Sequence, residues 1–257
     1  MENLPYSSVM GQRDKKFRGK APDADTSDET LPLVPRPVIW MGSSKADISE
    51  LPPPVKASFG HRLSQVQQGR KPLDTKALSQ FGAGVLELRE SFDRNAYRLM
   101  YVVALKKAVY VLHAFNKKSK SGIGLPRPDG RFDRASAQTG ASIGCGGLIM
   151  EISHEKSSGN VFADLGFSSA ETAELTVKSS LISTISDTIK ERKLTQMAAA
   201  QLCSTDQPTL SKVLRGRMES VTIDKLAAWL NALGRTVEIH VRPYDRKAKA
   251  GHLVISS

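Results

Sequence analysis

Cations gather at the ends of two apolar stretches in RLMYVVALKKAVYVLHAFNKKSKSG, residues 98–122. Arg98 begins the first stretch, and Lys117 and Lys118 follow the second. A strand that only fills a core needs no cations at its end, so these side chains indicate a phosphate-bearing partner. The alternative is a solvated strand end, because runs of charge are commonly exposed to water.

Three further polar residues could complete a site that acts on such a partner. Glu87 and Arg89 stand two positions apart in VLELRE and therefore share one face of a strand. His113 lies inside the second apolar stretch. Each also has a purely structural explanation, since Glu87 and Arg89 could pair with each other and His113 could be packed in a core.

A second group of polar residues lies in LTQMAAAQLCSTDQPTLSKVLRGR, residues 194–217. Thr195 and Asp206 stand at the N-cap positions of two short helices. The small residues Ala199 and Ala200 allow the first helix to approach the second. The pattern predicts two packed helices joined by a tight turn, with polar residues at the start of the second helix.

This segment resembles the helix-turn-helix of XRE (Cro/repressor-like) proteins, in which the second helix enters the DNA major groove by its N-terminal residues. The resemblance covers most of residues 150–242. It implies base contacts by Gln207, Thr209 and Lys212, and phosphate contacts by Gln196, Ser211, Arg215 and Arg217. Ser204 and Thr205 replace the glycine and the apolar residue usual in the turn, so we expect a looser turn. A helical bundle whose basic residues are only solvated is the alternative.

Charge is distributed unevenly along the 257 residues, which carry a net charge of +11. Residues 1–149 hold 23 Lys and Arg against 14 Asp and Glu, whereas residues 150–257 hold 14 against 12. The basic balance favours nucleic acid, an anionic surface or an acidic partner. The low charge of the second part predicts weak DNA binding by one copy and therefore a homodimer.

Cysteine and histidine usage argues against a metal or disulfide framework. Only Cys145 and Cys203 are present, and the five histidines show no ligand spacing, so we expect no metal and no cofactor. No apolar run reaches the ~18 residues of a membrane span, and residues 1–30 lack a secretory signal. A cytoplasmic protein without membrane contacts is the expectation.

The first part of the chain predicts a small α+β domain at residues 36–122, preceded by a disordered arm at 1–35. Val55, Phe59, Leu63 and Val66 form one apolar helical stripe, and Gly69 follows as a helix end. Three β-like runs come next, at residues 85–90, 96–104 and 108–115. Their short links favour helices packed on a three- to four-stranded, mainly antiparallel sheet.

The second part predicts an all-α domain at residues 150–243, with one terminal strand. Residues 123–149 show no periodicity and are interpreted as a linker, and residues 244–257 as a flexible tail. Ser168 and Glu171 have capping-box spacing at the start of a long helix. TVEIHV alternates as a strand, and the same strand of a second copy is its simplest partner.

Residues 36–122 resemble the HigB branch of the phage-derived RelE/ParE toxin superfamily, above all in YRLMYVV and VYVLHAFNKKSKSG. RelE and HigB toxins are ribosome-dependent mRNA endonucleases, whereas ParE acts on gyrase. The resemblance therefore implies a possible metal-independent endoribonuclease whose cations face messenger RNA. In such a reaction Arg98 and Arg89 would neutralise the phosphorane, Lys117 and Lys118 would hold neighbouring phosphates, and His113 or Glu87 would transfer protons.

The junction of the two parts indicates a fusion. The usual toxin ending is replaced by GLPRPDGRFDRASAQTGASIGCGGLI, after which MEISHEKSSGNVFADLGF resembles the start of a HigA antitoxin. We hypothesise that a frameshift joined two genes and that Met150 could serve as an internal start. The apolar segment formed by Val161, Phe162, Leu165 and Phe167 is expected to dock on the toxin part.

The sequence therefore predicts a toxin-antitoxin fusion, in which a tethered DNA-binding repressor restrains an endonuclease-like domain in cis or in trans. The alternative is a transcription regulator whose first domain is a decayed, non-catalytic interaction module.

Overall fold

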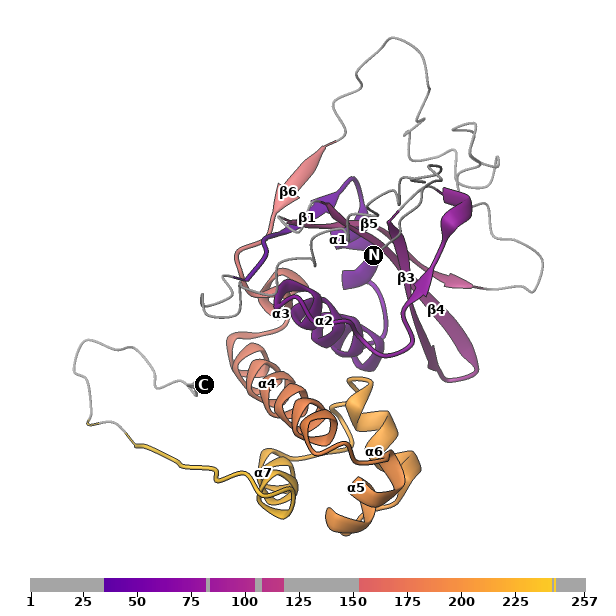
Figure 1. Cartoon of the computed structure of the whole chain (residues 1–257). Coiled ribbons are helices and arrows are strands. Elements are labelled where there is room, and N and C mark those ends of the chain that lie inside the picture. The colour runs from indigo at the N-terminus through magenta and orange to yellow at the C-terminus, as the bar shows by residue number, and fades with distance from the viewer. Residues whose placement is uncertain (1–34, 82–83, 105–107, 118–152, 242, 244–257) are drawn as a thin grey trace, which may run out of the picture. The chain divides into compact units, whose positions relative to one another are not determined.

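The computed structural model of the chain describes residues 35–81, 84–104, 108–117, 153–241 and 243 (Figure 1). We call residues 35–117 the N-terminal region and residues 153–243 the C-terminal region. The expected linker and tail lie outside the described residues, as do residues 1–34, Lys118 and Met150. Among the described helices, none combines the length and apolar character needed to cross a membrane.

Three antiparallel strands form the centre of the sheet, as the sequence predicted: β3 (Val85–Phe92), β4 (Asn95–Ala104) and β5 (Ala108–Lys117). Asp93 and Arg94 join β3 to β4 with φ of 47° and 61°, the positive values that a two-residue type I′ turn requires. This short connection fixes the register, in which Arg89 lies opposite Arg98.

The sheet is larger than predicted, because short strands extend both edges. β1 (Val38–Met41) runs parallel to β5, and β2 (Lys76–Ala77) pairs with β3. β6 (His154–Lys156) pairs antiparallel with β1, which gives a mixed six-stranded sheet in the order β2-β3-β4-β5-β1-β6. The prediction of three to four strands is corrected on this point. Three consecutive polar residues carry no strand periodicity, so β6 had no signal in the sequence.

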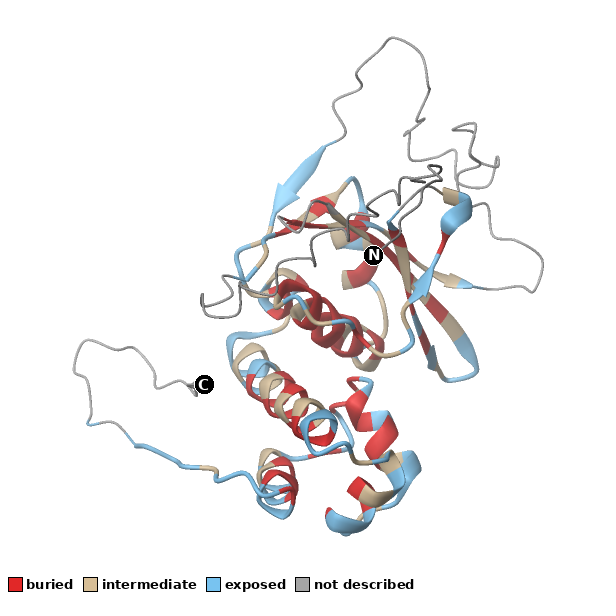
Figure 2. Ribbon diagram, in the orientation of Figure 1, coloured by how far each residue is buried: buried red, intermediate tan, exposed pale blue. Residues whose placement is uncertain are grey.

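Helix α2 (Pro53–Gln67) is buried along almost its whole length (Figure 2). Its predicted stripe of Val55, Phe59, Leu63 and Val66 packs in the core of the sheet. Its polar residues Ser58, His61, Arg62 and Gln65 are buried as well. The helix therefore has partners on two sides, and its buried polar groups need specific hydrogen bonds.

Two short helical segments complete the N-terminal region. α1 (Ser44–Ser49) follows β1 and contacts β5. Its N-cap position is Ser43, whose side chain makes no capping hydrogen bond. A 3-10 helix, η1 (Ser79–Phe81), precedes β3.

The C-terminal region is helical: α3 (Val161–Asp164), α4 (Ser169–Glu191), α5 (Gln196–Leu202), α6 (Gln207–Leu214) and α7 (Ile223–Ala232). The predicted caps are confirmed: Ser168 and Glu171 form a capping box, and Thr195 and Asp206 accept hydrogen bonds from Ala198 N–H and Thr209 N–H. Figure 1 shows α5 and α6 side by side, and their buried residues share one core with α4 and α7.

TVEIHV pairs with no strand among the described residues, and Ile239 and Val241 are 83% and 92% exposed. Pairing of this segment with a second copy stays a prediction. Leu202 at the end of α5 is 43% exposed.

The expected docking of the apolar segment is confirmed. Val161 and Leu165, both almost fully buried, belong to the core of the N-terminal region, and Phe167 packs against it. Phe162 belongs to the helical core and lies against Gly60 of α2, where an added Cβ would come within 2.7 Å of its ring. The segment therefore joins the two hydrophobic cores.

Candidate nucleic-acid interfaces

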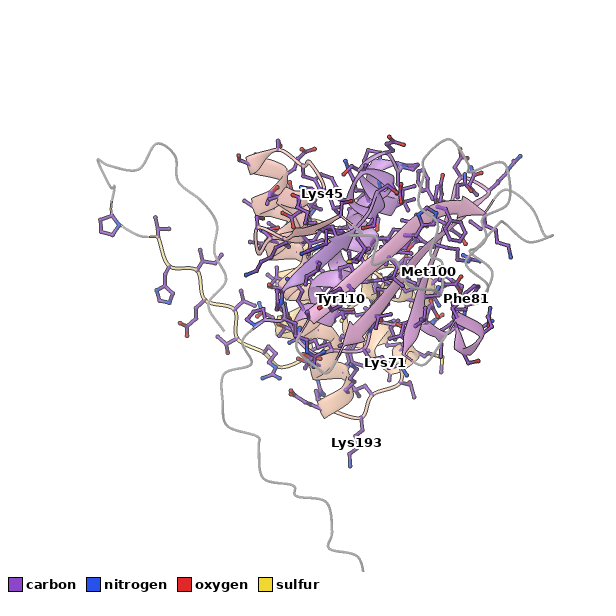
Figure 3. The ribbon with its side chains drawn as sticks, turned by 90° about the horizontal axis from the view of Figure 1, so that it is seen from above. Lys45, Lys71, Phe81, Met100, Tyr110 and Lys193 are labelled. Carbon is purple, nitrogen blue, oxygen red and sulfur yellow. The ribbon has the colours of Figure 1, made fainter. Side chains whose placement is uncertain are left out.

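The sheet carries α2 on one face, and its other face collects the predicted site residues of the N-terminal region. We call this other face of β3, β4 and β5 the open face. Figure 3 looks onto this sheet, with Met100 of β4 and Tyr110 of β5 labelled. Met100 of β4 lies opposite Glu87 of β3 on one side and His113 of β5 on the other. Arg98 of β4 likewise lies opposite Arg89 of β3 and Phe115 of β5. Glu87, Arg89, Arg98, His113 and Lys117 therefore share one face.

Glu87 holds two arginines at the centre of the open face. Its Oε1 lies 3.3 Å from Arg98 Nε, and its Oε2 lies 3.5 Å from Arg89 Nε. Arg98 also donates from Nη1 to the carbonyl oxygen of Tyr97 at 3.0 Å. The Arg89 side chain is 44% exposed and that of Arg98 is 17% exposed. One carboxylate thus orients two guanidinium groups, which suits an anionic ligand with more than one oxygen.

His113 is held by a residue that sequence reasoning missed. Its Nδ1 lies 2.7 Å from Oδ2 of Asp47 in α1, and its ring stacks on Phe115 with a centroid distance of 5.4 Å. Its side chain is 44% exposed, which contradicts a position inside the core. Asp47 lies 66 positions away in the sequence, and its spacing gave no signal of this contact.

The described lysine of the cluster, Lys117, is exposed at the end of β5, opposite Ala96. Among the described residues, no three His, Cys, Asp or Glu side chains gather in a way that could hold a metal ion. Arg89, Arg98 and Lys117 supply positive charge on the open face, and the exposed Lys76 of β2, opposite Glu87, adds to it.

The helix-turn-helix presents a second polar surface at the start of α6. Gln207 donates from Nε2 to Oε1 of Gln196 at 3.0 Å, so two of the predicted DNA-contacting residues meet there. Lys212 is exposed, one turn further along the helix. Hydrogen bonds from the Thr209 hydroxyl and backbone N–H lower the pKa of Asp206, which keeps this cap negatively charged.

The turn between these helices is well formed despite its serine. Ser204 adopts φ of 50°, and Thr205 N–H donates to the Ala200 carbonyl oxygen at 2.9 Å. This hydrogen bond closes the end of α5.

The remaining predicted phosphate contacts lie away from that surface. Ser211 is only 7% exposed. Arg215 pairs with Asp74 at 2.8 Å, and Arg217 binds Glu90 through Nε at 2.8 Å and Nη2 at 2.6 Å. The end of α6 therefore contacts the N-terminal region.

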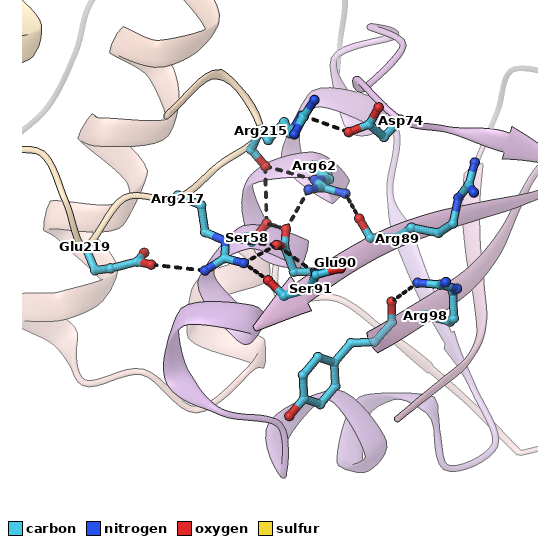
Figure 4. A network of polar contacts seen from close by, with 11 residues as sticks. Ser58, Arg62, Asp74, Arg89, Glu90, Ser91, Arg98, Arg215, Arg217 and Glu219 are labelled. Atoms are coloured by element: carbon cyan, nitrogen blue, oxygen red, sulfur yellow. Dashed lines mark hydrogen bonds and ion pairs between the residues drawn. The ribbon is translucent and has the colours of Figure 1, made fainter. Parts of the chain in front are cut away.

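Glu90 is the centre of a buried polar network (Figure 4). This carboxylate, 6% exposed, accepts hydrogen bonds at 2.6 Å from both Ser58 and Arg62 of α2, in addition to those from Arg217. Arg217 also donates to the carbonyl oxygen of Ser91. A buried carboxylate is costly to desolvate, and two guanidinium groups with several hydrogen bonds offset that cost.

Arg62 extends the network to the end of α6. It donates to the carbonyl oxygen of Arg215 at 2.9 Å and to that of Arg89 at 2.7 Å. A cation at the C-terminal end of a helix is favourable because the last carbonyl groups carry partial negative charge. One side chain of α2 thus binds both β3 and the helix-turn-helix.

His61 lies beside this network and is fully buried. Its Nδ1 is 2.9 Å from the Ser179 hydroxyl of α4, and its Nε2 has no hydrogen-bonding partner among the described residues. Burial and the charges of Arg62 and Arg70 lower the pKa of His61 to about 3, so it is neutral at pH 7. Gly216 packs directly against its ring, where an added Cβ would come within 2.8 Å.

Comparisons with known proteins agree with this division into two regions. Residues 46–131 match the family model of phage-derived Gp49-like proteins, and residues 161–242 match a helix-turn-helix domain model. No curated protein matches the chain. A solved structure described as a candidate XRE family transcriptional regulator is 28% identical, covers 34% of this chain and 98% of its own, and has a TM-score of 0.32. The chain thus carries a Gp49-like region followed by a helix-turn-helix domain.

Proposed function

We propose that the chain is a fused toxin-antitoxin regulator. In this proposal the N-terminal region is a HigB-like, metal-independent mRNA endonuclease, and the C-terminal region is a HigA-like repressor of its own operator. The observation that carries the proposal is the buried interface around Glu90. It joins the two regions, whereas Gln207, Lys212 and the side chains of the open face lie outside it.

The open face supports an RNA-directed role for the N-terminal region. Arg89, Arg98 and Lys117 supply positive charge on one side of the sheet, and His113 supplies an imidazole that can accept or donate a proton. Cleavage by the ribose 2′-hydroxyl needs charge balance and proton transfer but no metal.

The start of α6 supports DNA binding by the C-terminal region. Glutamine suits adenine edges, and lysine suits guanine or phosphate, so Gln207 and Lys212 are the expected specificity residues. Ile239 and Val241 extend an apolar face that begins with the partly buried Val237. Pairing of this segment with its copy would form a homodimer able to bind two operator half-sites.

Tethering supports restraint of the toxin-like region in cis. Two parts of one chain meet at an effective concentration on the order of mM, so no second molecule is required. The described contacts of the C-terminal region lie on α1, on α2 and the loop that follows it, at the end of β3 and along β1. We infer that restraint excludes a target as large as the ribosome rather than filling the open face.

DNA binding can be tested by gel shift on the DNA upstream of the gene. Lys212→Ala should weaken binding by about 1–3 kcal/mol if the lysine contacts a base. Lys190→Ala is the matched control, because this exposed lysine lies on α4. Equal affinity of both variants and the unaltered chain would remove α6 as the reading helix.

Toxicity can be tested by inducing the full chain and following growth and message cleavage. Leu165→Asp should release the docked segment and increase cleavage, because a buried leucine of the shared core becomes charged. Adding Arg98→Ala should abolish that gain, and Leu202→Asp at an exposed leucine should have no effect. If no variant slows growth, a regulator with a non-catalytic first domain becomes the better description.

A further inference from the structure

Asp47 and His113 form a pair on the open face that resembles a base and its orienting carboxylate. We propose that His113 is the general base for attack by the ribose 2′-hydroxyl and that Asp47 is its positioning residue. This assignment rests on the ribonuclease activity proposed above, and it chooses His113 over Glu87 as the proton acceptor.

The hydrogen bond fixes which ring nitrogen of His113 carries the proton. An ionised carboxylate only accepts hydrogen bonds, so the 2.7 Å contact with Asp47 Oδ2 requires a proton on Nδ1. In the neutral imidazole, Nε2 then bears the lone pair and can accept a proton. Asp47 is itself held, since its Oδ2 accepts a hydrogen bond from the Ser43 hydroxyl at 3.2 Å.

The ring of His113 is oriented from a second side. Phe115 stacks on it with an interplanar angle of 27°. A stacked ring with one nitrogen bonded has little freedom to rotate, and such preorganisation lowers the cost of reaching a reactive geometry. Because the side chain is 44% exposed, a substrate can still reach it.

Glu87 is less suited to accept the proton. Its two oxygens are each directed at an arginine, and its side chain is 14% exposed. Protonation of this carboxylate would weaken both contacts. Arg89 and Arg98 would then lose their anchor at the step in which they are to neutralise the phosphorane. Glu87 is therefore better described as the anchor of the two guanidinium groups.

Arg98 lies within reach of the same phosphodiester as His113. It is opposite Phe115, two positions along β5 from His113, and such diagonal neighbours are about 7–8 Å apart. A base at His113 and a cation at Arg98 can therefore act on the 2′-hydroxyl and the phosphate of one nucleotide step.

The reaction then balances without a cofactor. His113 Nε2 takes the proton of the 2′-hydroxyl, and the 2′-oxygen bonds to phosphorus while the bond from phosphorus to the 5′-oxygen breaks. The products are a 2′,3′-cyclic phosphate and a 5′-hydroxyl, whose proton comes from water. The imidazolium returns its proton to the resulting hydroxide.

Activity should be measured in the full chain carrying Leu165→Asp, which releases the docked segment, on a single-stranded RNA oligonucleotide and on a ribosome-bound message. His113→Ala should reduce the cleavage rate by about 100- to 10,000-fold, the usual contribution of a general base. Asp47→Ala should reduce it by about 10- to 100-fold, with partial recovery in Asp47→Glu. Glu50→Ala, an exposed acidic residue at the end of the same helix, should leave the rate unchanged.

The tautomer of His113 gives a readout that does not depend on activity. In ¹⁵N-histidine spectra of the full chain, the neutral ring should carry its proton on Nδ1, and Asp47→Ala should move it toward Nε2. An unchanged tautomer, or an unchanged cleavage rate in Asp47→Ala, would overturn the positioning role. If neither RNA is cut by the chain carrying Leu165→Asp, the ribonuclease proposal and the role of His113 as a base fail, and the spectrum alone decides the role of Asp47.

Discussion

Ser204 adopts a left-handed backbone conformation that costs a non-glycine residue about 1–2 kcal/mol. Ser204→Gly should therefore stabilise the protein by about 0.5–1 kcal/mol, after the greater freedom of glycine in the unfolded chain is subtracted. Urea unfolding measures the change. Ser204→Ala is the control, since alanine has the same Cβ and should give no stabilisation.

His61 should make the stability depend on pH. Its pKa is about 3 in the folded protein and about 6.5 when unfolded, so below pH 6.5 the unfolded chain binds a proton that the native protein does not. The free energy of unfolding is therefore unaffected by this group above pH 6.5 and falls as the pH drops toward 3. Between pH 7 and pH 5 the loss should be about 2 kcal/mol.

Urea unfolding at these two pH values can isolate this contribution. His61→Gln should remove the loss, because glutamine does not titrate. His154→Gln changes an exposed histidine and should retain it. An identical pH dependence in His61→Gln and the unaltered chain would show that other groups are responsible.

Strand parity predicted part of the candidate site, and tertiary contacts decided the rest. The shared face of Glu87 and Arg89 follows from their spacing alone. His113 and Tyr110 differ in parity yet lie on one face, because the register shifts at a bulge between Tyr101 and Met100 of β4. Asp47 joins the site only when α1 packs on β5, which no local pattern encodes.

At the scale of elements, the close approach of α2 and α3 depends on Gly60. Gly60→Ala would bring a methyl group within 2.7 Å of the Phe162 ring, an overpacking that costs about 1–3 kcal/mol. The higher helix propensity of alanine offsets about 1 kcal/mol of this cost. We expect a net destabilisation of up to about 2 kcal/mol in urea unfolding.

The same substitution in a Phe162→Leu background separates the two effects. There the clash is relieved, and Gly60→Ala should become neutral or stabilising by up to about 1 kcal/mol. An equal effect of Gly60→Ala in both backgrounds would mean that Phe162 is not what restricts this position.

Elements in which apolar residues recur regularly over many positions were predictable from the sequence, and elements that depend on a distant partner were not. The stripe of α2, the caps of α4 to α6 and the three central strands follow local rules. β6 exists because the edge of β1 offers it hydrogen bonds, such as that from Ser157 N–H to the Val38 carbonyl oxygen. Residues 236–241 instead have a strand pattern in the sequence but pair with no strand in the described part of the chain.

At the scale of the whole molecule, the two regions should unfold together. Trp40 lies in the core of the sheet and Trp229 in the helical core, and both are almost fully buried. Trp229→Phe leaves a reporter in one core, and Trp40→Phe leaves a reporter in the other. We expect both fluorescence transitions at the same urea concentration, because Glu90 and the 161–167 segment couple the cores.

Glu90→Gln tests the coupling in both single-tryptophan backgrounds. Loss of the carboxylate leaves Arg62 and Arg217 without their counter-charge, and breaking a buried ion pair in this way costs about 3–5 kcal/mol. The two transitions should then move to lower urea or separate. Transitions that already differ in the parent variants would contradict a shared folding unit.

The outermost strand of the sheet has a consequence for protein turnover in the cell. β6 is short and polar, and such a strand discourages pairing with other molecules. If a protease removed the helix-turn-helix together with β6, the longer and partly apolar edge of β1 would become accessible. Loss of the C-terminal region would then favour self-association of the remaining fragment.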